Sequence, residues 1–355
     1  MSAMPAPPVL VEVTRGRVGE ADALVESRHR GSLALVDGHG ETILALGDIA
    51  SPVYPRSAVK TFQALALVLS GAADEYRFGP AELSVAQASH DAEPEHLAVV
   101  GGMLGVLGLE ADDLACGVPV RRAPNPRSDD APLTPLHHEC SGKHAGMLAV
   151  ARHLGVDPAG YERLDHPVQQ RVRAALEAVT GATLTPQLCG TDGCSLPTWA
   201  APLEAFARGF AHLATAPGEV GEAGRRLIEA VGEAPQMIWG TGQFDTRVGA
   251  LLGPDVLTKR GAEGVYCGVV RPRADGGTTL ARSGFGFAVK IEDGAQRAAR
   301  TVAAAVLQAA LRPAGEAGEM LASFAERPIR TARGAVAGSV RPSGALREAL
   351  AALSG

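Results

Sequence analysis

A serine and a lysine stand three residues apart in the segment PRSAVKTFQ, just before an apolar run. On a helix, Ser57 and Lys60 would share one face, so the lysine amine could reach the serine hydroxyl. A neutral amine there can take the hydroxyl proton, and burial or a neighbouring cation would favour the neutral form. The alternative is a serine that only caps the helix start.

Lysine is scarce in this chain, and its few positions are therefore informative. The sequence contains 33 lysines and arginines together, of which only four are lysines: Lys60, Lys143, Lys259 and Lys290. Arginine stays protonated in proteins, whereas a lysine amine can be neutral, act as a base or bind a metal. We therefore expect at least two of the four to do chemistry that arginine cannot do.

A second serine and a second lysine extend the first pair. Lys259 lies in TKRGAEGVYC, just before a predicted strand, and Ser89 precedes a polar His-Asp pair. The spacing S-x-x-K, with a lysine and glycine near a late strand, is reminiscent of the S-x-x-K and K-T-G elements of β-lactamases and penicillin-binding proteins. An ordinary turn lysine is the alternative interpretation of Lys259.

Two segments, HHECSGKHAGML and CGTDGCSLP, bring cysteines together with other metal-binding residue types. Cys140 and Lys143 have helical i, i+3 spacing, and Cys194 follows Asp192 in a glycine-rich turn. Thiolates bind zinc well, so two cysteines on separate loops with a third donor predict a zinc site. His137, His138 and His144 are further possible donors, and buried free cysteines are the alternative.

The elements that must position these residues follow from apolar spacing. Alternating segments predict strands at 9–16 and 31–48, split by the turn DGHG, and later at 236–242, 264–272 and 278–294, with RADGG (273–277) as a turn. Spacing of 3.6 residues predicts helices over 57–70, 79–88, 94–106, 142–154, 167–179, 199–214, 219–231, 295–311 and 343–353.

Strands at both ends of the chain thus flank a helical middle. We predict an α/β (α+β) protein with a mixed or antiparallel sheet made from both chain ends, covered by helices and interrupted by a helical insertion. The predicted domains are a discontinuous sheet domain, 1–56 with 235–355, and a mainly helical domain, 57–234, that carries the Ser-Lys and Cys motifs.

Composition limits the function classes. The net charge is −6 without a basic block, which argues against nucleic-acid binding. The apolar runs are shorter than a membrane span, and the N-terminus lacks the features of a secretory signal, so we expect a cytoplasmic protein without membrane contact. Five scattered cysteines do not form a disulfide framework.

With these segments in view, the chain resembles the Rhizobium etli-type L-asparaginases, the class 3 or asparaginase II family. The matching stretches are SPVYPRSAVKTFQALALV, QASHDAEPEHL, HHECSGKHAGMLA, DHPVQQRV, GTDGCSLP, GTGQFDT, TKRGAEGVYCGVV and FAVKIEDGAQRA. The resemblance implies a fold similar to serine β-lactamases and glutaminases, hydrolysis of L-asparagine to aspartate and ammonia, and a homodimer.

The resemblance also implies roles for individual residues. The catalytic residues would be Ser57 with Lys60 and Ser89 with Lys259. One zinc ion per chain would be held by Cys140, Lys143 and Cys194, and the substrate would be contacted by Arg56, Asp192 and His144. One departure is Ser195, where glycine usually follows the cysteine, and this change could alter the turn.

On the sequence, we expect Ser57 to attack, because helix geometry fixes its lysine partner. Two other functions stay open. The first is a glutaminase or another β-lactamase-like amidohydrolase, although the chain lacks S-D-N and has Lys-Arg-Gly in place of Lys-Thr-Gly. The second is a non-catalytic zinc-binding or regulatory protein on the same fold.

Overall fold

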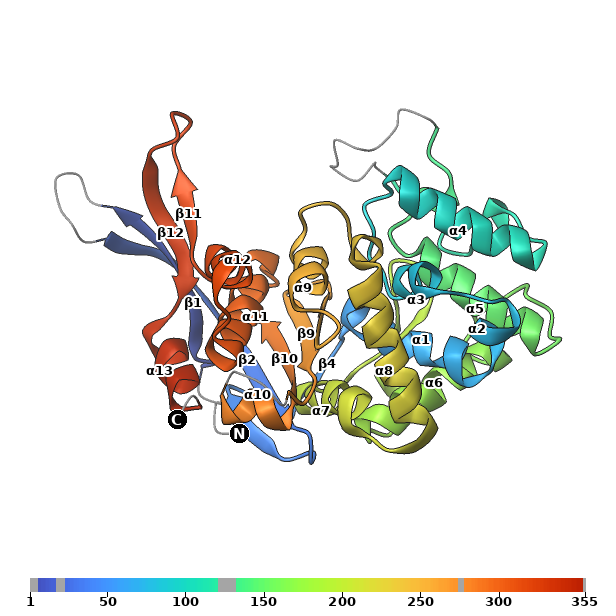
Figure 1. The fold of residues 1–355 in the computed structure, drawn as a ribbon, viewed down its shortest axis with the longest axis horizontal. Coiled ribbons are helices and arrows are strands. Elements are labelled where there is room, and N and C mark those ends of the chain that lie inside the picture. The colour runs from blue at the N-terminus through green and yellow to red at the C-terminus, as the bar shows by residue number, and fades with distance from the viewer. Residues whose placement is uncertain (1–5, 17–22, 121–131, 274–277, 354–355) are drawn as a thin grey trace.

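The computed structural model describes residues 6–16, 23–120, 132–273 and 278–353 (Figure 1). Its main sheet has the strand order β11-β12-β1-β2-β10-β9-β8, with β3 paired to β2, and every pair in it is antiparallel. Its strands are β1 (Val9–Gly16), β2 (Ala23–Asp37), β3 (Thr42–Leu46), β8 (Val256–Arg260), β9 (Val265–Val270), β10 (Phe285–Ile291), β11 (Arg327–Arg330) and β12 (Val336–Pro342).

Helices and two small strand pairs make up most of the rest. The pairs are β4 (Pro52–Val53) with β7 (Ala201–Pro202), and β5 (Cys189–Thr191) with β6 (Pro197–Trp199). The helices are α1 (Lys60–Leu69), α2 (Ala72–Glu75), α3 (Pro80–Val85), α4 (Pro94–Leu107), α5 (Ser141–His153), α6 (Pro167–Thr180), α7 (Leu203–Thr215), α8 (Gly218–Glu233), α9 (Phe244–Leu252), α10 (Thr279–Ser283), α11 (Gln296–Leu311), α12 (Gly315–Ala325) and α13 (Gly344–Ala352). Single 3₁₀ turns cover Arg56–Val59, Ala111–Asp113, Pro135–His137, Pro186–Leu188 and Pro235–Ile238.

The predicted sheet from both chain ends, with a helical insertion, is confirmed. N-terminal β1 pairs with C-terminal β12, and β2 pairs with β10. In Figure 1 the helices from α1 to α8 gather on one side of the molecule, while α11, α12 and α13 lie with the sheet on the other. No helix within the described part of the chain is long and apolar enough to cross a membrane.

Alternation along the strands divides the interior into two cores. Ala34 and Val36 of β2 belong to the core shared with the helical insertion, whereas Leu33 and Leu35 belong to the core under α11. On β8, Leu257 faces the insertion by the same rule. Because α7 packs directly on β2, β9 and β10, the insertion and the sheet share one of these cores, and the division into two domains remains a prediction.

Several element predictions are wrong. Residues 236–242 form a 3₁₀ turn and a loop, and 279–283 form α10, so that only β10 of the predicted strand 278–294 is extended. Helix α7 begins at Leu203, because the residues before it pair in β6 and β7. The hairpin β11–β12, the first half of β2, α9 and α12 were not predicted. Most of the predicted turn 273–277 lies outside the described residues.

Close approach of α7 to the sheet depends on a glycine. A Cβ atom at Gly286 would collide with Ala207 O and Ala211 N of α7. We therefore expect Gly286→Ala to lower the free energy of unfolding by about 2–4 kcal/mol, through overpacking that backbone atoms cannot relieve. Urea denaturation measures this change.

The control for this prediction is Gly102→Ala in α4, where no described atom outside the neighbouring backbone of the helix and the two chain neighbours lies within 4 Å of the added methyl group. It should raise stability by about 0.5–1 kcal/mol, because alanine favours helix. Equal stability of Gly286→Ala and wild type would contradict the packing described here.

Candidate active site

The hydroxyl of Ser89 lies between two lysine amines in the interior. Lys60 Nζ is 3.0 Å and Lys259 Nζ is 2.9 Å from Ser89 Oγ. Both lysines are fully buried, and Ser89 is 1% exposed. Three of the four predicted catalytic residues therefore meet at one point, from α1, from the loop after α3 and from β8.

Lys60 is held at this point by backbone carbonyls as well as by the serine. Its amine donates to Ala88 O at 2.5 Å and to Glu139 O at 3.4 Å, besides Ser89 Oγ. Three acceptors match the three hydrogens of an ammonium group. The interior thus offers Lys60 a complete set of partners in its charged form.

Lys259 is directed at Ser89 by the pleat of the sheet. It shares the helix-facing side of β8 with Leu257, whereas Thr258 points the other way to Asp245 at 2.7 Å. Burial, followed by the positive charge of Lys60, holds the pKa of Lys259 well below that of an ordinary lysine. Lys259 is therefore the member of the pair that favours the neutral form.

The loop that carries Ser89 is fixed along its backbone. Ser89 N donates to Ile238 O at 3.1 Å, His90 N to Glu139 O at 3.2 Å, and Asp91 N to Trp239 O at 2.8 Å. The segment wrongly predicted as a strand, 236–242, thus still supplies two backbone carbonyl acceptors to the site, from Ile238 and Trp239. These backbone bonds hold the Ser89 loop so that its hydroxyl lies within hydrogen-bond distance of both amines.

Arg260 is a site residue that the sequence did not reveal. Its guanidinium donates to Ser89 O at 3.2 Å and to Glu139 at 3.1 Å, and it lies 3.9 Å from the centroid of the Trp239 ring. The only sequence signal was its position beside Lys259. It ties the serine loop to β8 from the opposite side of the strand.

The expected hydrogen bond between Ser57 and Lys60 is absent among the described residues, because the Lys60 amine is turned to Ser89. Ser57 lies in the 3₁₀ turn before α1 and is half-buried. Neither this turn nor α1 has a side-chain cap, so the capping role is not seen either. Arg56, just before it, has φ +53, a backbone conformation that costs free energy in a non-glycine residue.

The predicted metal ligands form a second cluster. Lys143 Nζ donates to Cys194 Sγ at 3.0 Å, Cys194 Sγ lies 3.8 Å from Asp192, and Arg56 Nε donates to Asp192 at 2.6 Å. Cys140, Lys143 and Cys194 are at most 3% exposed. α5 supplies Lys143 and begins after Cys140, and the β5–β6 hairpin supplies Asp192 and Cys194.

Charges within this cluster shift one another. A hydrogen bond from Cys194, followed by the charges of Lys60 and Lys143, lowers the pKa of Cys140 despite burial. The same bond and burial raise the pKa of Cys194. Burial opposes the charge of Lys143, but the two sulfurs and Asp192 raise its pKa. These shifts favour the anionic form of Cys140 and the cationic form of Lys143.

The donor set of this cluster fits zinc, because two soft sulfur ligands and one amine converge in a dry interior. Within the described residues, no group of three or more His, Cys, Asp or Glu side chains is arranged to hold a metal. A zinc site here would consequently need Lys143 as its third protein ligand, with the amine deprotonated.

His144, a predicted substrate contact, lies in the interior. Its Nδ1 atom is 2.5 Å from the Tyr161 hydroxyl, and the ring packs edge-on against Tyr161. Burial, followed by the charge of Lys143, holds the pKa of His144 well below that of an ordinary histidine. This position favours support of α5 over direct contact with a substrate, and the predicted role remains untested.

Ser195 occupies a backbone conformation that suits glycine. Its φ is +72, and the turn is closed by Ser195 N to Asp192 O at 3.0 Å and Asp192 N to Leu196 O at 2.8 Å. The departure from the family pattern therefore leaves the turn in place, at a conformational cost for the serine.

Comparison with known proteins identifies the family. Residues 11–342 match the family model described as L-asparaginase II. The chain belongs to the L-asparaginase II family. No curated protein matches the chain.

Some solved structures are similar in chain fold. Mglu in its native form is 14% identical, with a TM-score of 0.40 over 76% of this chain and 61% of that chain. A Bacillus glutaminase is 13% identical, with a TM-score of 0.40 over 82% of this chain and 88% of that chain. A probable glutaminase of Bacillus subtilis is 14% identical, with a TM-score of 0.33 over 83% and 87%. The chain thus spans about three fifths of Mglu.

Removal of the buried Lys259 amine should stabilise the protein while abolishing activity. Below pH about 10 the unfolded chain holds this amine protonated, whereas the fold favours the neutral form, so folding must release a proton. We expect Lys259→Met to raise the free energy of unfolding by about 1–4 kcal/mol at pH 7. The gain should shrink as the pH approaches about 10, as urea titrations at several pH values can show.

The matched control is Thr61→Val, which replaces a buried hydroxyl next to Lys60 that has no hydrogen-bond partner among the described residues. It carries no titratable group, so its effect on stability should not vary with pH. A pH-independent effect of Lys259→Met would contradict a neutral Lys259 in the fold.

A second prediction concerns the turn at Ser195. Ser195→Gly should raise the free energy of unfolding by up to about 1 kcal/mol, because glycine adopts φ +72 without strain. The gain stays small because glycine also loses more backbone entropy on folding than serine does. Thermal unfolding measures the difference. Ser70→Gly, at a position with φ −75, should instead lower stability. A destabilised Ser195→Gly variant would show that the turn tolerates serine at no cost.

Proposed function

We propose that this protein is an L-asparaginase of the Rhizobium etli type, which hydrolyses the side-chain amide of L-asparagine to L-aspartate and ammonia. The observation that carries the proposal is the Ser89 hydroxyl shared by the amines of Lys60 and Lys259. This arrangement supports serine-lysine acyl transfer, and family membership supports an amide as the substrate.

Ser57 is the proposed nucleophile. It is half-buried, so a substrate can approach it, whereas Ser89 is enclosed by its partners. It occupies the serine position of S-x-x-K, beside the strained Arg56. Catalytic hydrogen bonds are often long or misaligned before substrate binds, so the present direction of Lys60 is compatible with this role.

The two lysines and Ser89 form a proton path. Two amines on one hydroxyl favour a single shared positive charge, because like charges repel strongly in the interior. In the resting site the proton is on Lys60 and Lys259 is neutral. Transfer of this proton through the Ser89 hydroxyl to Lys259 leaves Lys60 neutral, so that Lys60 accepts the proton of Ser57 as its oxygen attacks the amide carbon. Lys60 then gives the proton taken from Ser57 to the departing nitrogen, which leaves as ammonia, while Ser89 carries protons between the two amines. Water then hydrolyses the β-aspartyl ester and restores the Ser57 hydroxyl.

Two other functions remain as alternatives. A glutaminase would use the same residues on a side chain one methylene longer, a difference worth about 1–3 kcal/mol in a fitted pocket. A non-catalytic zinc-binding or regulatory protein would need none of the Ser-Lys contacts, which is why the geometry favours an enzyme. An ammonia-release assay separates the three. Release mainly from asparagine indicates an asparaginase, release mainly from glutamine indicates a glutaminase, and release from neither amide indicates a non-catalytic protein.

Single serine variants test the roles within the proton path. Ser57→Ala should lower kcat about 10⁴-fold and abolish the covalent aspartyl-enzyme, because the attacking oxygen is missing. Ser89→Ala should lower kcat about 10²–10³-fold through loss of proton transfer, yet still form the adduct. Mass spectrometry of enzyme quenched during turnover detects the adduct.

Ser70→Ala, at the end of α1, is the control and should retain wild-type turnover. Near-normal turnover of Ser57→Ala, with loss of the adduct only in Ser89→Ala, would make Ser89 the nucleophile and overturn the assignment.

We further propose that Cys140, Lys143 and Cys194 bind one zinc ion per chain. When bound, zinc would supply a fixed positive charge beside the substrate carboxylate. The residues themselves join α5 to the β5–β6 hairpin, and through Asp192 they orient Arg56.

Metal content tests the zinc site directly. Cys194→Ser should reduce bound zinc from about one per chain to near zero, because a hydroxyl is a poor zinc ligand. It should also raise KM more than it lowers kcat if the metal only positions the substrate. The control is Cys189→Ala in the same hairpin, which should keep its metal. If wild-type protein refolded in excess zinc contains no bound zinc, the proposed metal site is wrong.

A further inference from the structure

Lys290, the fourth lysine, has no part in the proton path, but it lines a cavity beside it. The cavity has a volume of about 580 Å³ and lies between β4, the β5–β6 hairpin and the β8–β9 turn. Its polar and aromatic lining includes Tyr54, Arg56, Thr191, Thr198, Glu263 and Lys290. Arg56 on the cavity wall is the chain neighbour of Ser57, the proposed nucleophile.

The sheet places Lys290 on the same face as Lys259. Lys290 follows Ala288 by two residues on β10, and Ala288 belongs to the core shared with the helical insertion. Lys259 pairs with Cys267, and Cys267 pairs with Ala288. Strand spacing and rise then put the Cα atoms of the two lysines about 12 Å apart, which a small ligand and two side chains can span.

The charges in the cavity match those of an amino acid. Arg56 and Lys290 are two cations on its wall, and Glu263 is a carboxylate on the same wall. Arg56 is oriented by Asp192, and the Lys290 amine is oriented by a hydrogen bond to the Glu263 carbonyl. Partial burial lowers the pKa of Lys290, which is consistent with a cation that gains from an anionic partner.

We propose that this cavity is the amino-acid site of the enzyme, in which Lys290 and Arg56 hold the α-carboxylate of the substrate and Glu263 holds its α-ammonium group. The inference rests on the proposed function for the identity of the amino acid, asparagine, but not for the class of ligand. Charge-assisted bonds to both ends would orient the side-chain amide toward Ser57.

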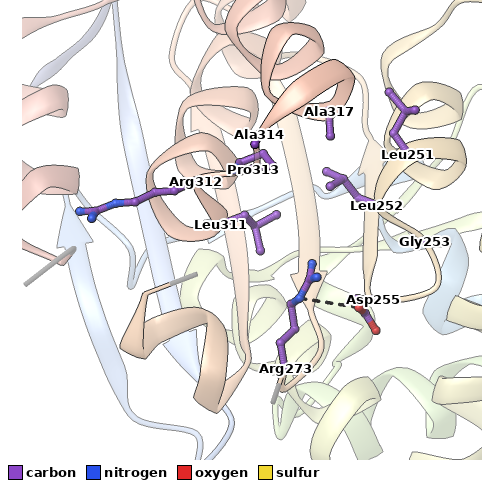
Figure 2. Close-up of a pocket in the computed structure, with 10 residues that line it drawn as sticks. All are labelled: Leu251, Leu252, Gly253, Asp255, Arg273, Leu311, Arg312, Pro313, Ala314 and Ala317. Atoms are coloured by element: carbon purple, nitrogen blue, oxygen red, sulfur yellow. Dashed lines mark ion pairs between the residues drawn. The ribbon is translucent and has the colours of Figure 1, made fainter. Parts of the chain in front are cut away.

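A second cavity provides a comparison within the same molecule (Figure 2). It has a volume of about 440 Å³ and is lined by Leu251, Leu252 and Leu311 together with charged residues. Its Arg273 is paired with Asp255 at 3.7 Å, as the dashed line in Figure 2 shows. This cavity lies at the start of β8, away from Lys259 near its end, so that Arg273 serves as a control cation.

Calorimetric titration with L-aspartate and succinate tests the site without turnover. Lys290→Gln should weaken binding of both ligands about tenfold or more, and Lys290→Arg should retain most of the affinity. Glu263→Gln should weaken the binding of L-aspartate but not that of succinate, because succinate lacks the ammonium group. Arg273→Gln should bind both ligands like the wild type.

Kinetics adds the link to the substrate. Lys290→Gln should raise KM for asparagine about tenfold with kcat within about twofold of wild type, because the carboxylate bond persists through the reaction. L-Aspartate should inhibit the wild type competitively. Noncompetitive inhibition would overturn the assignment of the cavity to the substrate.

Other outcomes separate this site from the proposed function. Unchanged KM and ligand affinity in Lys290→Gln, even with a lowered melting temperature, would overturn the site and leave a purely structural lysine. Lys290-dependent binding of L-aspartate without ammonia release from asparagine would instead leave the site standing and overturn the L-asparaginase proposal.

Discussion

The structure depends on one buried interaction, in which two lysine amines are hydrogen-bonded to a single serine hydroxyl. At 4 Å, two unit charges interact by about 1 kcal/mol in water but about 4 kcal/mol near a protein surface. The fold therefore supports one positive charge over Ser89 far better than two. A hydroxyl common to both amines lets that charge change its position by a small movement of protons.

Such a pair needs a rigid surround, and three separate parts of the chain provide it. Backbone carbonyls of the Ser89 loop and of Glu139 take the hydrogens of Lys60, the pleat of β8 directs Lys259, and Arg260 ties the loop to the strand. The apolar cores on both faces of the sheet supply the free energy that compensates for burying these polar groups.

Composition made part of this site predictable. Scarcity marked the lysines, whereas Lys259 was expected just before a strand, and only the structure places it within β8 on the helix-facing side. The pairing of Lys60 was not predictable, because helix spacing says which residues can meet but not which acceptor wins, and the carbonyls of Ala88 and Glu139 come from distant segments. Arg260 and the loop 236–242 were missed for the same reason, since their partners are set by tertiary contacts alone.

The antiparallel pairing of β1 with β12 has a consequence for how the chain acquires its shape. Thr14 and Ser339 are neighbours although 325 residues separate them. During synthesis β1 and β2 emerge long before their partners β12 and β10, so these two strands lack part of their pairing while the insertion folds. Lys259 can reach Ser89 only after β8 leaves the ribosome. A truncated nascent chain that ends before β8 would thus contain Ser57, Lys60 and Ser89 in the helical insertion and still be inactive, because Lys259 is missing.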